Sequence, residues 1–206
     1  MCMAKSGILI GAGGHAKVIA DIIRAAGDTV AGYYDDHVPK GTKLQSAEVL
    51  GAIDDISDKS RDAEYILAIG SNLIRKKMAE RFAHLPFYTA IHPSACIGSE
   101  VCIGEGSCVM PLAVLSAEAK VGRHCILNTH SVLEHESCLD DFVHLAPGSV
   151  LCGNVSVGSG CMIGAGAVVK NNLAIAPDSV IGAGAVVTKD IVEAGVYAGV
   201  PVRRIK

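Results

Sequence analysis

An aliphatic residue stands at every sixth position through the second half of the chain, from Ile91 to Val187, without a gap. Small or aliphatic residues such as Ala95 and Val101 follow four places later, so each hexad offers two apolar side chains two residues apart. Residues two apart on a strand point to the same face. Very short strands joined by turns at this period predict a parallel β-helix, in which each coil buries its apolar face against the next.

The first part of the chain has a different pattern, in which short apolar runs alternate with amphipathic segments. Val18, Ile19, Ile22 and Ile23 share one side of the first such segment, and Gly27 ends it. This alternation predicts an α/β fold. The expected elements are strands at residues 7–10, 29–34 and 64–69 and helices at residues 15–26 and from residue 72 onward.

The second expected helix carries Ile74, Met78 and Phe82 at helical spacing, which predicts that these side chains form its inner stripe. We place the end of the α/β domain near Pro86, so that residues 1–88 form the first domain and residues 89–206 the second. The first domain has only about half the length of a full dinucleotide-binding domain, so we expect a Rossmann-like half domain that holds one nucleotide.

Residues directly before the inward aliphatic positions point outward, and they recur on the same face of a three-sided coil every eighteen residues. One such column is apolar throughout, the second is mixed and the third is the most polar. A continuous apolar stripe on an outer face implies a partner, so the pattern predicts a cyclic homotrimer with clefts between protomers; a monomer with an apolar side is the alternative. The apolar column comprises Cys96, Val114, Val132, Val150, Val168 and Val186.

Composition and charge narrow the class of protein. Of the 206 residues 50% are apolar, and the formal net charge is -3 with Lys and Arg scattered, which predicts no nucleic-acid partner. No apolar run approaches the roughly 20 residues that span a bilayer, and residues 1–10 are too short for a signal peptide, so we expect a cytoplasmic protein without a membrane partner. The 8 cysteines include no CxxC pair, which predicts packing in a reducing compartment and no metal site.

A glycine-rich segment, Gly-Ala-Gly-Gly-His at residues 11–15, follows the first expected strand and opens the first expected helix. Backbone N–H groups and the positive helix end converge at such a point, which makes it a candidate phosphate site. NAD sites use a similar loop, with an acidic residue about 20 positions on that binds the ribose, and Asp35 or Asp36 fits that place. The missing second half of a dinucleotide domain favours a single nucleotide, but the residues alone leave both interpretations open.

His135 is a candidate catalytic base. It comes two residues after Leu133, in the turn beyond the apolar column, and Glu134 and Glu136 flank it. A neighbouring carboxylate fixes the tautomer of an imidazole and raises its basicity, although a turn at His135 is needed to bring Glu136 to the ring. The alternative is an exposed histidine without a role, beside a solvated Glu134.

Six segments together resemble one family: IGAGGHAKV, YYDD, AIGSNLIRKK, IHPSACIG, ILNTHSVLEHE and AGVPVRRI. Over essentially its whole length the chain is similar to the left-handed β-helix, or hexapeptide-repeat, sugar acyltransferases. Within that family it resembles the nucleotide-linked 4-amino-sugar N-acetyltransferases and the sialic-acid O-acetyltransferases. The resemblance implies an α/β Rossmann-like half domain followed by a left-handed parallel β-helix, assembled as a homotrimer.

In that family the glycine loop and the aspartate pair hold the diphosphate and base of a nucleotide sugar. The resemblance therefore implies a substrate site in which Gly13, Gly14, His15, Asp35 and Asp36 take part. For His15, a plain position at the start of a helix is the alternative.

The resemblance also implies which residues carry the chemistry. His135 would be the general base that takes a proton from the sugar amine, with Glu136 as its helper carboxylate. His144 would lie in the same pocket, Asn128 would orient the acceptor, and the N–H of Gly153 would stabilise the oxyanion. Interface packing is the alternative for His144, and a plain turn is the alternative for Gly153.

The coenzyme positions of the family also have counterparts here. Ala165 and Ala183 each stand between two glycines, in register one coil apart, and would line a groove for the pantetheine arm together with Gly153. Arg203, in the cationic tail, would meet the adenosine 3'-phosphate. Tight turns that need glycine are a second and compatible explanation of the coil edges.

The residues and the resemblance together imply an acetyl-CoA-dependent N-acetyltransferase. It would acetylate the 4-amino group of a UDP-linked 4-amino-6-deoxy sugar for a surface glycan or for protein glycosylation, with acetyl-CoA as co-substrate and no metal. An O-acetyltransferase of sialic acid or a related sugar would use the same base, oxyanion donor and groove. A non-catalytic nucleotide or NAD sensor built on the first domain is a third alternative.

Overall fold

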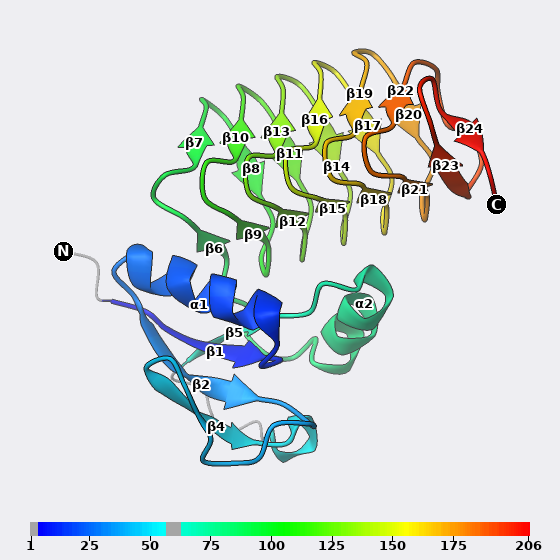
Figure 1. The fold of residues 1–206 in the computed structure, drawn as a ribbon. Coiled ribbons are helices and arrows are strands. Elements are labelled where there is room, and N and C mark those ends of the chain that lie inside the picture. Colours follow the sequence, from blue (N-terminus) through cyan, green and yellow to red (C-terminus); the bar gives the residue numbers. More distant parts are fainter. Residues whose placement is uncertain (1–3, 57–62) are drawn as a thin grey trace.

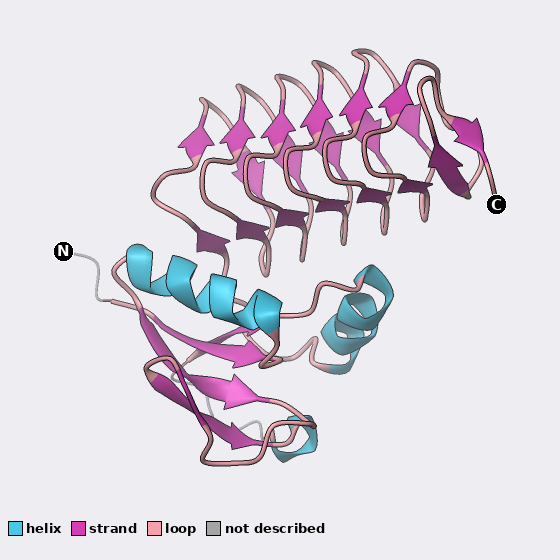
Figure 2. Cartoon of the chain, in the orientation of Figure 1, coloured by secondary structure: helices cyan, strands magenta, loops and turns pink. Residues whose placement is uncertain are grey.

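The computed structural model describes residues 4–56 and 63–206 and has two parts of different architecture (Figure 1). The first part is a five-stranded sheet with helices beside it, and the second is a stack of three-sided coils. Within the described residues every helix belongs to the first part, and the coils consist of strands and turns (Figure 2). The expected fold class, an α/β part followed by a parallel β-helix, is confirmed.

The α/β part is built on four parallel strands and one short antiparallel strand, β3, with the strand order β3-β4-β2-β1-β5. Its first helix buries Ile19, Ile22 and Ile23 and is followed by Gly27, whose φ of 87° lies in the left-handed region that favours glycine. The elements are β1 (Ser6–Ile10), α1 (Gly14–Ala25), β2 (Thr29–Tyr34), β3 (Lys43–Leu44), β4 (Ala47–Gly51), the short helix η1 (Ile53–Asp55), β5 (Glu64–Leu67) and α2 (Asn72–Arg81).

Helix α2 does not bury the predicted stripe. Phe82 is buried just after its end and Met78 is half-buried, but Ile74 is 49% exposed, and the residues that the helix itself buries are Arg75 and Ala79. The prediction for Ile74 is wrong because α2 faces backbone carbonyl groups of the β-helix, which a polar donor satisfies and an aliphatic side chain does not.

Three parallel sheets form the sides of the β-helix. The valine face, named for its outward residues, contains β7 (Cys96–Ile97), β10 (Val114–Leu115), β13 (Val132–Leu133), β16 (Val150–Leu151), β19 (Val168–Val169) and β22 (Val186–Val187). The open face contains β8 (Cys102–Ile103), β11 (Lys120–Val121), β14 (Cys138–Leu139), β17 (Ser156–Val157) and β20 (Ala174–Ile175). The docked face, on which the α/β part packs, contains β6 (Ala90–Ile91), β9 (Cys108–Val109), β12 (Ile126–Leu127), β15 (His144–Leu145), β18 (Met162–Ile163), β21 (Val180–Ile181), β23 (Val196–Ala198) and the antiparallel β24 (Arg203–Arg204).

The second residue of each two-residue strand from β6 to β22 is an aliphatic residue of the hexad series, which confirms the predicted register. From Val109 onward these side chains are buried in one continuous core. Ile97 is an exception, because it is 40% exposed in the first strand of its sheet, where no earlier coil covers it. From Glu100 to Gly184 every sixth residue also has a positive φ, at the second position of each corner turn.

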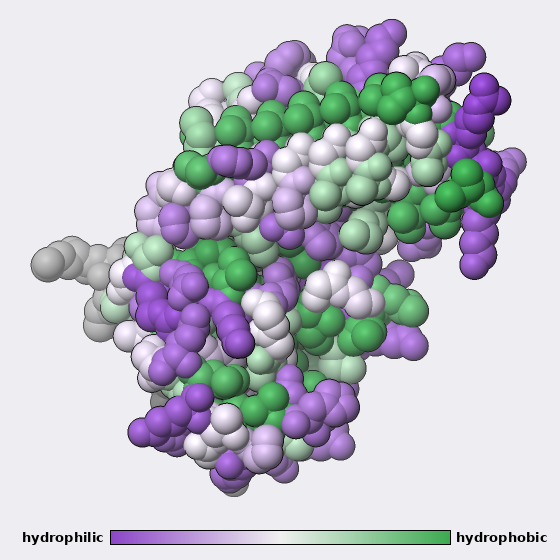
Figure 3. Space-filling model, viewed as in Figure 1, coloured by the Kyte–Doolittle hydropathy of each residue, from purple (hydrophilic) through white to green (hydrophobic). Residues whose placement is uncertain are grey.

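The outward columns differ in what covers them. On the docked face Ala90, Cys108 and Ile126 are buried in one cluster with residues of α1, so the chain's own α/β part covers this column. The column of the valine face stays half-exposed after Cys96, and a row of hydrophobic side chains runs along it in Figure 3. A surface of this kind remains available to a partner.

The thiols follow the coil geometry. Cys96, Cys102 and Cys108 lie on three different faces, and Cys125 and Cys161 are buried in the core. The seven cysteines in the described residues are free, and Cys2 lies outside the described residues. In the same residues no helix has the length and apolar character to cross a membrane, and no cluster of three or more His, Cys, Asp or Glu side chains is arranged to hold a metal ion.

Candidate active site

The glycine loop lies at the carboxyl end of β1, where it turns into α1. Gly11 needs to be glycine for structural reasons, because its φ is 111° and a Cβ there would approach the Ala68 carbonyl oxygen to 3.0 Å. Gly13 and Gly14 have no such requirement: their φ angles are not positive, and a Cβ at either would meet nothing within 4 Å. The N-cap residue of α1 is Gly13, so no side chain caps the N–H groups of the first turn, and these groups are candidates to bind an anion.

The aspartate pair shapes this loop from the end of β2. Asp35 accepts hydrogen bonds from the Ala12 N–H at 2.8 Å and from the His37 N–H at 2.8 Å. Asp36 accepts one from the Ile53 N–H at 2.8 Å. The structure therefore brings Asp35 to the glycine loop as predicted by order along the chain, but both carboxylates already tie loops of the α/β part together.

A second group of predicted residues lies where the α/β part meets the docked face. The Asn128 Oδ1 accepts from the Thr129 N–H at 2.8 Å, which turns its Nδ2 toward the His144 Nε2, 3.2 Å away. The amide donates, so Nε2 is the acceptor and the ring is neutral. His15 lies close to this group from α1, and the backbone of Gly70 is beside the His144 ring.

Burial keeps these imidazoles uncharged. Burial, followed by the positive charge of Arg75, lowers the pKa of His15 to about 4. The same two causes in the same order, followed by the charge of His15, lower the pKa of His144 to about 4, against a smaller opposite effect of the Gly70 backbone. His15 Nε2 and His144 Nδ1 are buried without a hydrogen-bond partner in the described residues, which is uncommon for buried polar atoms and makes this place a candidate binding site.

A third buried histidine, His124, also has a lowered pKa, and the three together make the free energy of unfolding depend on pH. Burial also lowers the pKa of His124 to about 4, helped by Arg123 and Arg75. Between the ordinary value of 6.5 and about 4 the unfolded chain binds protons that these three histidines do not bind in the native state. We expect the free energy of unfolding to fall as the pH decreases through this window, measured by urea titration at one protein concentration. His124→Gln should make the decrease less steep, and an unchanged slope would contradict this account.

The predicted base lies in a corner turn between the valine face and the open face. His135 Nδ1 is 3.0 Å from Glu136 Oε2, and the turn that this contact requires is present, since Glu136 has a φ of 59°. The His135 side chain is 58% exposed. A carboxylate on Nδ1 holds the proton there, which leaves the Nε2 lone pair free to accept another.

Gly153 occupies the equivalent corner position one coil after His135. A Cβ on Gly153 would lie 2.5 Å from both Nε2 and Cε1 of His135, so the imidazole fills the space where a side chain would be. The Gly153 N–H donates no hydrogen bond to any described residue. The pair therefore places a proton acceptor directly beside an unused backbone donor.

One chain does not bring all the predicted catalytic residues together. His135, Glu136 and Gly153 form one group at a corner of the prism, whereas Asn128 and His144 belong to the docked face. On a three-sided prism the corner between two faces is the edge opposite the third face. Within one chain His144 is therefore on the far side of the coil stack from His135.

The predicted coenzyme residues lie at two further places. Ala165 and Ala183 are exposed at the corner between the docked face and the valine face, and the glycines that follow them have φ of 65° and 66°, which accounts for glycine there. Arg203 is exposed on β24 and borders a cavity of about 340 Å³ with Lys189 and Arg204. Neither place is the corner of Gly153, so a single chain does not gather the four residues in one groove.

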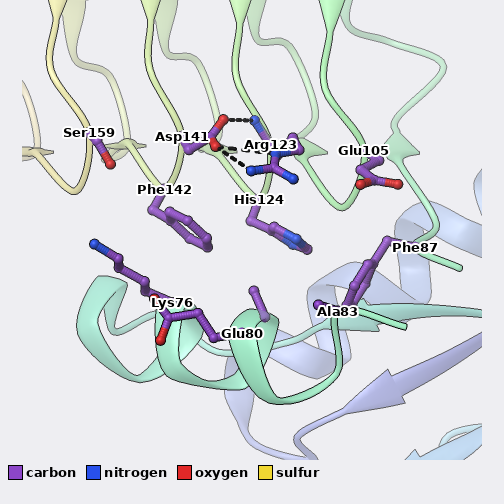
Figure 4. Close-up of a pocket in the computed structure, with 11 residues that line it drawn as sticks. Lys76, Glu80, Ala83, Phe87, Glu105, Arg123, His124, Asp141, Phe142 and Ser159 are labelled. Carbon is purple, nitrogen blue, oxygen red and sulfur yellow. Dashed lines mark hydrogen bonds and ion pairs between the residues drawn. The ribbon is translucent and has the colours of Figure 1, made fainter. Parts of the chain in front are cut away.

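A separate cavity of about 370 Å³ opens between α2 and the coil corners (Figure 4). Phe87 meets the His124 ring edge-on and Phe142 stacks on it, with an ion pair of Arg123 and Asp141 above them. None of the site residues predicted from the sequence lines this cavity.

Two residues at the interface of the two parts were not predicted. Arg75 and Asn72, both on α2, bond to backbone carbonyls of the coils. The segment AIGSNLIRKK contains them, but in a sequence pattern they look like solvent-facing polar residues.

Known families match both parts of the chain. Residues 8–82 match the PglD N-terminal domain, and residues 139–171 match the bacterial transferase hexapeptide of six repeats. The coil stack and these two matches define the class of β-helix transferases built from hexapeptide repeats.

Individual relatives narrow the class. The acetyltransferase domain of PglB from Neisseria gonorrhoeae FA1090, also solved with acetyl coenzyme A, is 33% identical with a TM-score of 0.89, covering 98% of this chain and 100% of that one. PerB from Caulobacter crescentus, solved with CoA and GDP-perosamine, is 33% identical with a TM-score of 0.87, covering 100% and 99%. The UDP-N-acetylbacillosamine N-acetyltransferase of Bacillus subtilis (strain 168) is 38% identical over 111 residues, which are 52% of this chain and 51% of that protein. The chain thus aligns with about half the length of this curated relative, and it belongs to the family of hexapeptide-repeat sugar N-acetyltransferases.

Proposed function

We propose that the protein is an acetyl-CoA-dependent N-acetyltransferase that acetylates the 4-amino group of a UDP-linked 4-amino-6-deoxy sugar, for a surface glycan or for protein glycosylation. The observation that carries the proposal is the His135 imidazole, which is held by Glu136 and packed against Gly153, whose N–H donates to no described residue. The relatives named for acetylation of nucleotide-linked amino sugars support the substrate class, and the Bacillus subtilis relative supports UDP.

The chemistry follows from these groups. His135 Nε2 accepts a proton from the sugar amine as the nitrogen attacks the carbonyl carbon of the thioester. The carbonyl oxygen becomes an oxyanion, which the Gly153 N–H stabilises; loss of one such donor typically costs about 2.7 to 4 kcal/mol of transition-state stabilisation. When the C–N bond is complete, the C–S bond breaks, and the thiolate of coenzyme A takes the proton from His135.

The nucleotide end of the substrate would bind at the glycine loop, in the proposed domain of residues 1–88. Gly13 and Gly14 lack any structural need for glycine, which is the expected sign of a backbone that a phosphate approaches closely. Asp35 and Asp36 would meet the ribose or base. The imidazoles of His15 and His144, which each have an unpaired nitrogen, and the Asn128 amide would receive the diphosphate or the sugar.

The coenzyme would bind to the proposed acyltransferase domain of residues 89–206, along Ala165 and Ala183 with its 3'-phosphate at Arg203. Assembly into a homotrimer would unite this groove with the corner of Gly153 and His135, because one chain alone keeps them apart. The half-exposed valine face supplies an apolar surface for that contact. The free thiols of the described residues fit a reducing compartment, and we place the enzyme in the cytoplasm.

Thiol release from acetyl-CoA, measured with UDP-, GDP- and dTDP-linked 4-amino sugars, tests the proposal. We expect turnover with the UDP-linked sugar and none in a reaction without acceptor. Turnover of free sialic acid instead would establish the O-acetyltransferase alternative. Absence of turnover with every acceptor, together with heat protection by NAD, would establish the sensor alternative.

A further inference from the structure

Helix α2 buries an arginine at the junction of the two parts. Arg75 is 1% exposed and is the largest fully buried side chain of the described residues. Burial is the main cause that lowers its pKa to about 10, so the guanidinium stays charged near neutral pH. No carboxylate forms an ion pair with it in the part of the chain that the structure describes.

The guanidinium is satisfied almost entirely by backbone oxygens. Nε donates to the His124 carbonyl at 2.8 Å, and Nη2 donates to the Phe142 carbonyl at 3.0 Å. On the other side Nη1 donates to the carbonyls of Ile69 at 3.0 Å and Gly70 at 3.2 Å. One side chain thus joins two coils of the β-helix to the loop between β5 and α2.

Asn72 extends this contact to a third coil. Its Oδ1 accepts from Arg75 Nη2 at 2.8 Å, and its Nδ2 donates to the carbonyls of Gly160 and Cys161, both at 2.9 Å. His124, Phe142 and Gly160 are eighteen residues apart, at the same corner of successive coils. Two side chains three residues apart on α2 therefore bind carbonyls that the coil repeat presents in a row.

The loop held in this way borders the proposed nucleotide-sugar site. Gly70 lies beside the His144 ring, and Ala68, two residues earlier, is packed against Gly11 at the start of the glycine loop. Arg75 is also close enough to lower the pKa of both His15 and His144. A change in its contacts would move the loop on which the relative positions of these groups depend.

We propose that Arg75, with Asn72, is a positioning residue for the nucleotide sugar: it fixes the loop of Ile69 and Gly70 to the coils, so that the glycine loop and His15 face the same site as His144. This inference rests on the proposed function of the α/β part. The positioning role requires the five directed hydrogen bonds that the Arg75 guanidinium donates, and a positive charge alone does not provide them.

Calorimetric titration of the intact protein with UDP and, separately, with coenzyme A tests the inference. Arg75→Lys keeps the charge but has one nitrogen in place of three, so we expect the Kd for UDP to rise about tenfold, equal to about 1.4 kcal/mol. Asn72→Ala should act in the same direction. The Kd for coenzyme A should stay within about twofold, since the proposed coenzyme groove is elsewhere on the prism. Lys77→Met, an exposed change on the same helix, is the matched control and should bind both molecules as the unaltered protein does.

The outcomes separate the two proposals. UDP binding by Arg75→Lys and Asn72→Ala equal to that of the unaltered protein would overturn the positioning role and leave the proposed function intact. A parallel loss of UDP and coenzyme A binding would also overturn it, because a general folding defect would then account for the change. Absence of UDP binding by the unaltered protein would overturn the UDP-linked substrate and the inference with it.

Discussion

His135→Ala is expected to lower kcat for acetyl transfer by about 10²- to 10⁴-fold, the range for loss of a positioned general base. Glu136 holds the ring at 3.0 Å and its Nε2 lies beside Gly153 of the next coil, so the substitution removes the proton acceptor next to the proposed oxyanion donor. Thiol release from acetyl-CoA with the accepted amino sugar measures the effect. The Kd for UDP should be unchanged, because UDP lacks the sugar amine on which His135 acts.

His92→Ala is a suitable control for that experiment. His92 is a second turn histidine of the β-helix, near its first strand, and its ring bonds to Ser94 Oγ at 2.7 Å. This control should keep full activity. If His135→Ala retained more than about a tenth of the normal kcat, His135 would not be the base.

Gly153→Ala is expected to lower kcat by about 10²-fold while the protein stays folded, the size of loss that follows a displacement of about 1 Å at a reacting group. Its Cβ would lie 2.5 Å from Nε2 and Cε1 of His135, so the imidazole must leave its place. The backbone tolerates alanine there, because Gly153 is not among the residues with positive φ. Thermal unfolding and thiol release, measured on the same preparation, separate a loss of kcat from a loss of stability.

Gly27→Ala provides the matched change for Gly153→Ala. Gly27 has a φ of 87° and a Cβ there meets nothing within 4 Å, so this substitution strains the backbone without touching His135. It should lower stability by about 1 kcal/mol and leave kcat unaltered. A Gly153→Ala enzyme with normal kcat would contradict the packed arrangement of ring and glycine.

The hexad periodicity predicted the strands of the β-helix, but it did not predict the exposure of side chains where the coil stack begins. The position of Leu133 in the hexad series fixed β13, the corner that follows it and hence the surroundings of His135. Ile97 belongs to the same series yet is 40% exposed, because periodicity describes the repeat and contains no information about where the stack begins.

The junction of the two parts was the least predictable region. Helical spacing assigned Ile74 to the inside of α2, whereas Arg75 is buried there, because amphipathic patterns assume an apolar surface opposite the helix. The sequence led us to expect that Asp35 takes part in the substrate site. Its hydrogen bonds with the Ala12 and His37 N–H groups depend on loop geometry, which the order of residues does not reveal. That His135 and His144 lie on opposite sides of the prism follows only once the coils are counted around three faces.

Glu136 keeps its carboxylate beside His135 only by adopting a φ of 59°, a conformation that costs a residue with a side chain roughly 1 kcal/mol. Asn154 and Asn172 occupy the same place in the next two coils, and asparagine accepts that backbone more readily. At this corner the residue that favours stability therefore differs from the residue that favours catalysis. Selection for heat resistance alone would favour asparagine at residue 136, and it would produce a sturdier protein whose imidazole lacks the carboxylate at Nδ1.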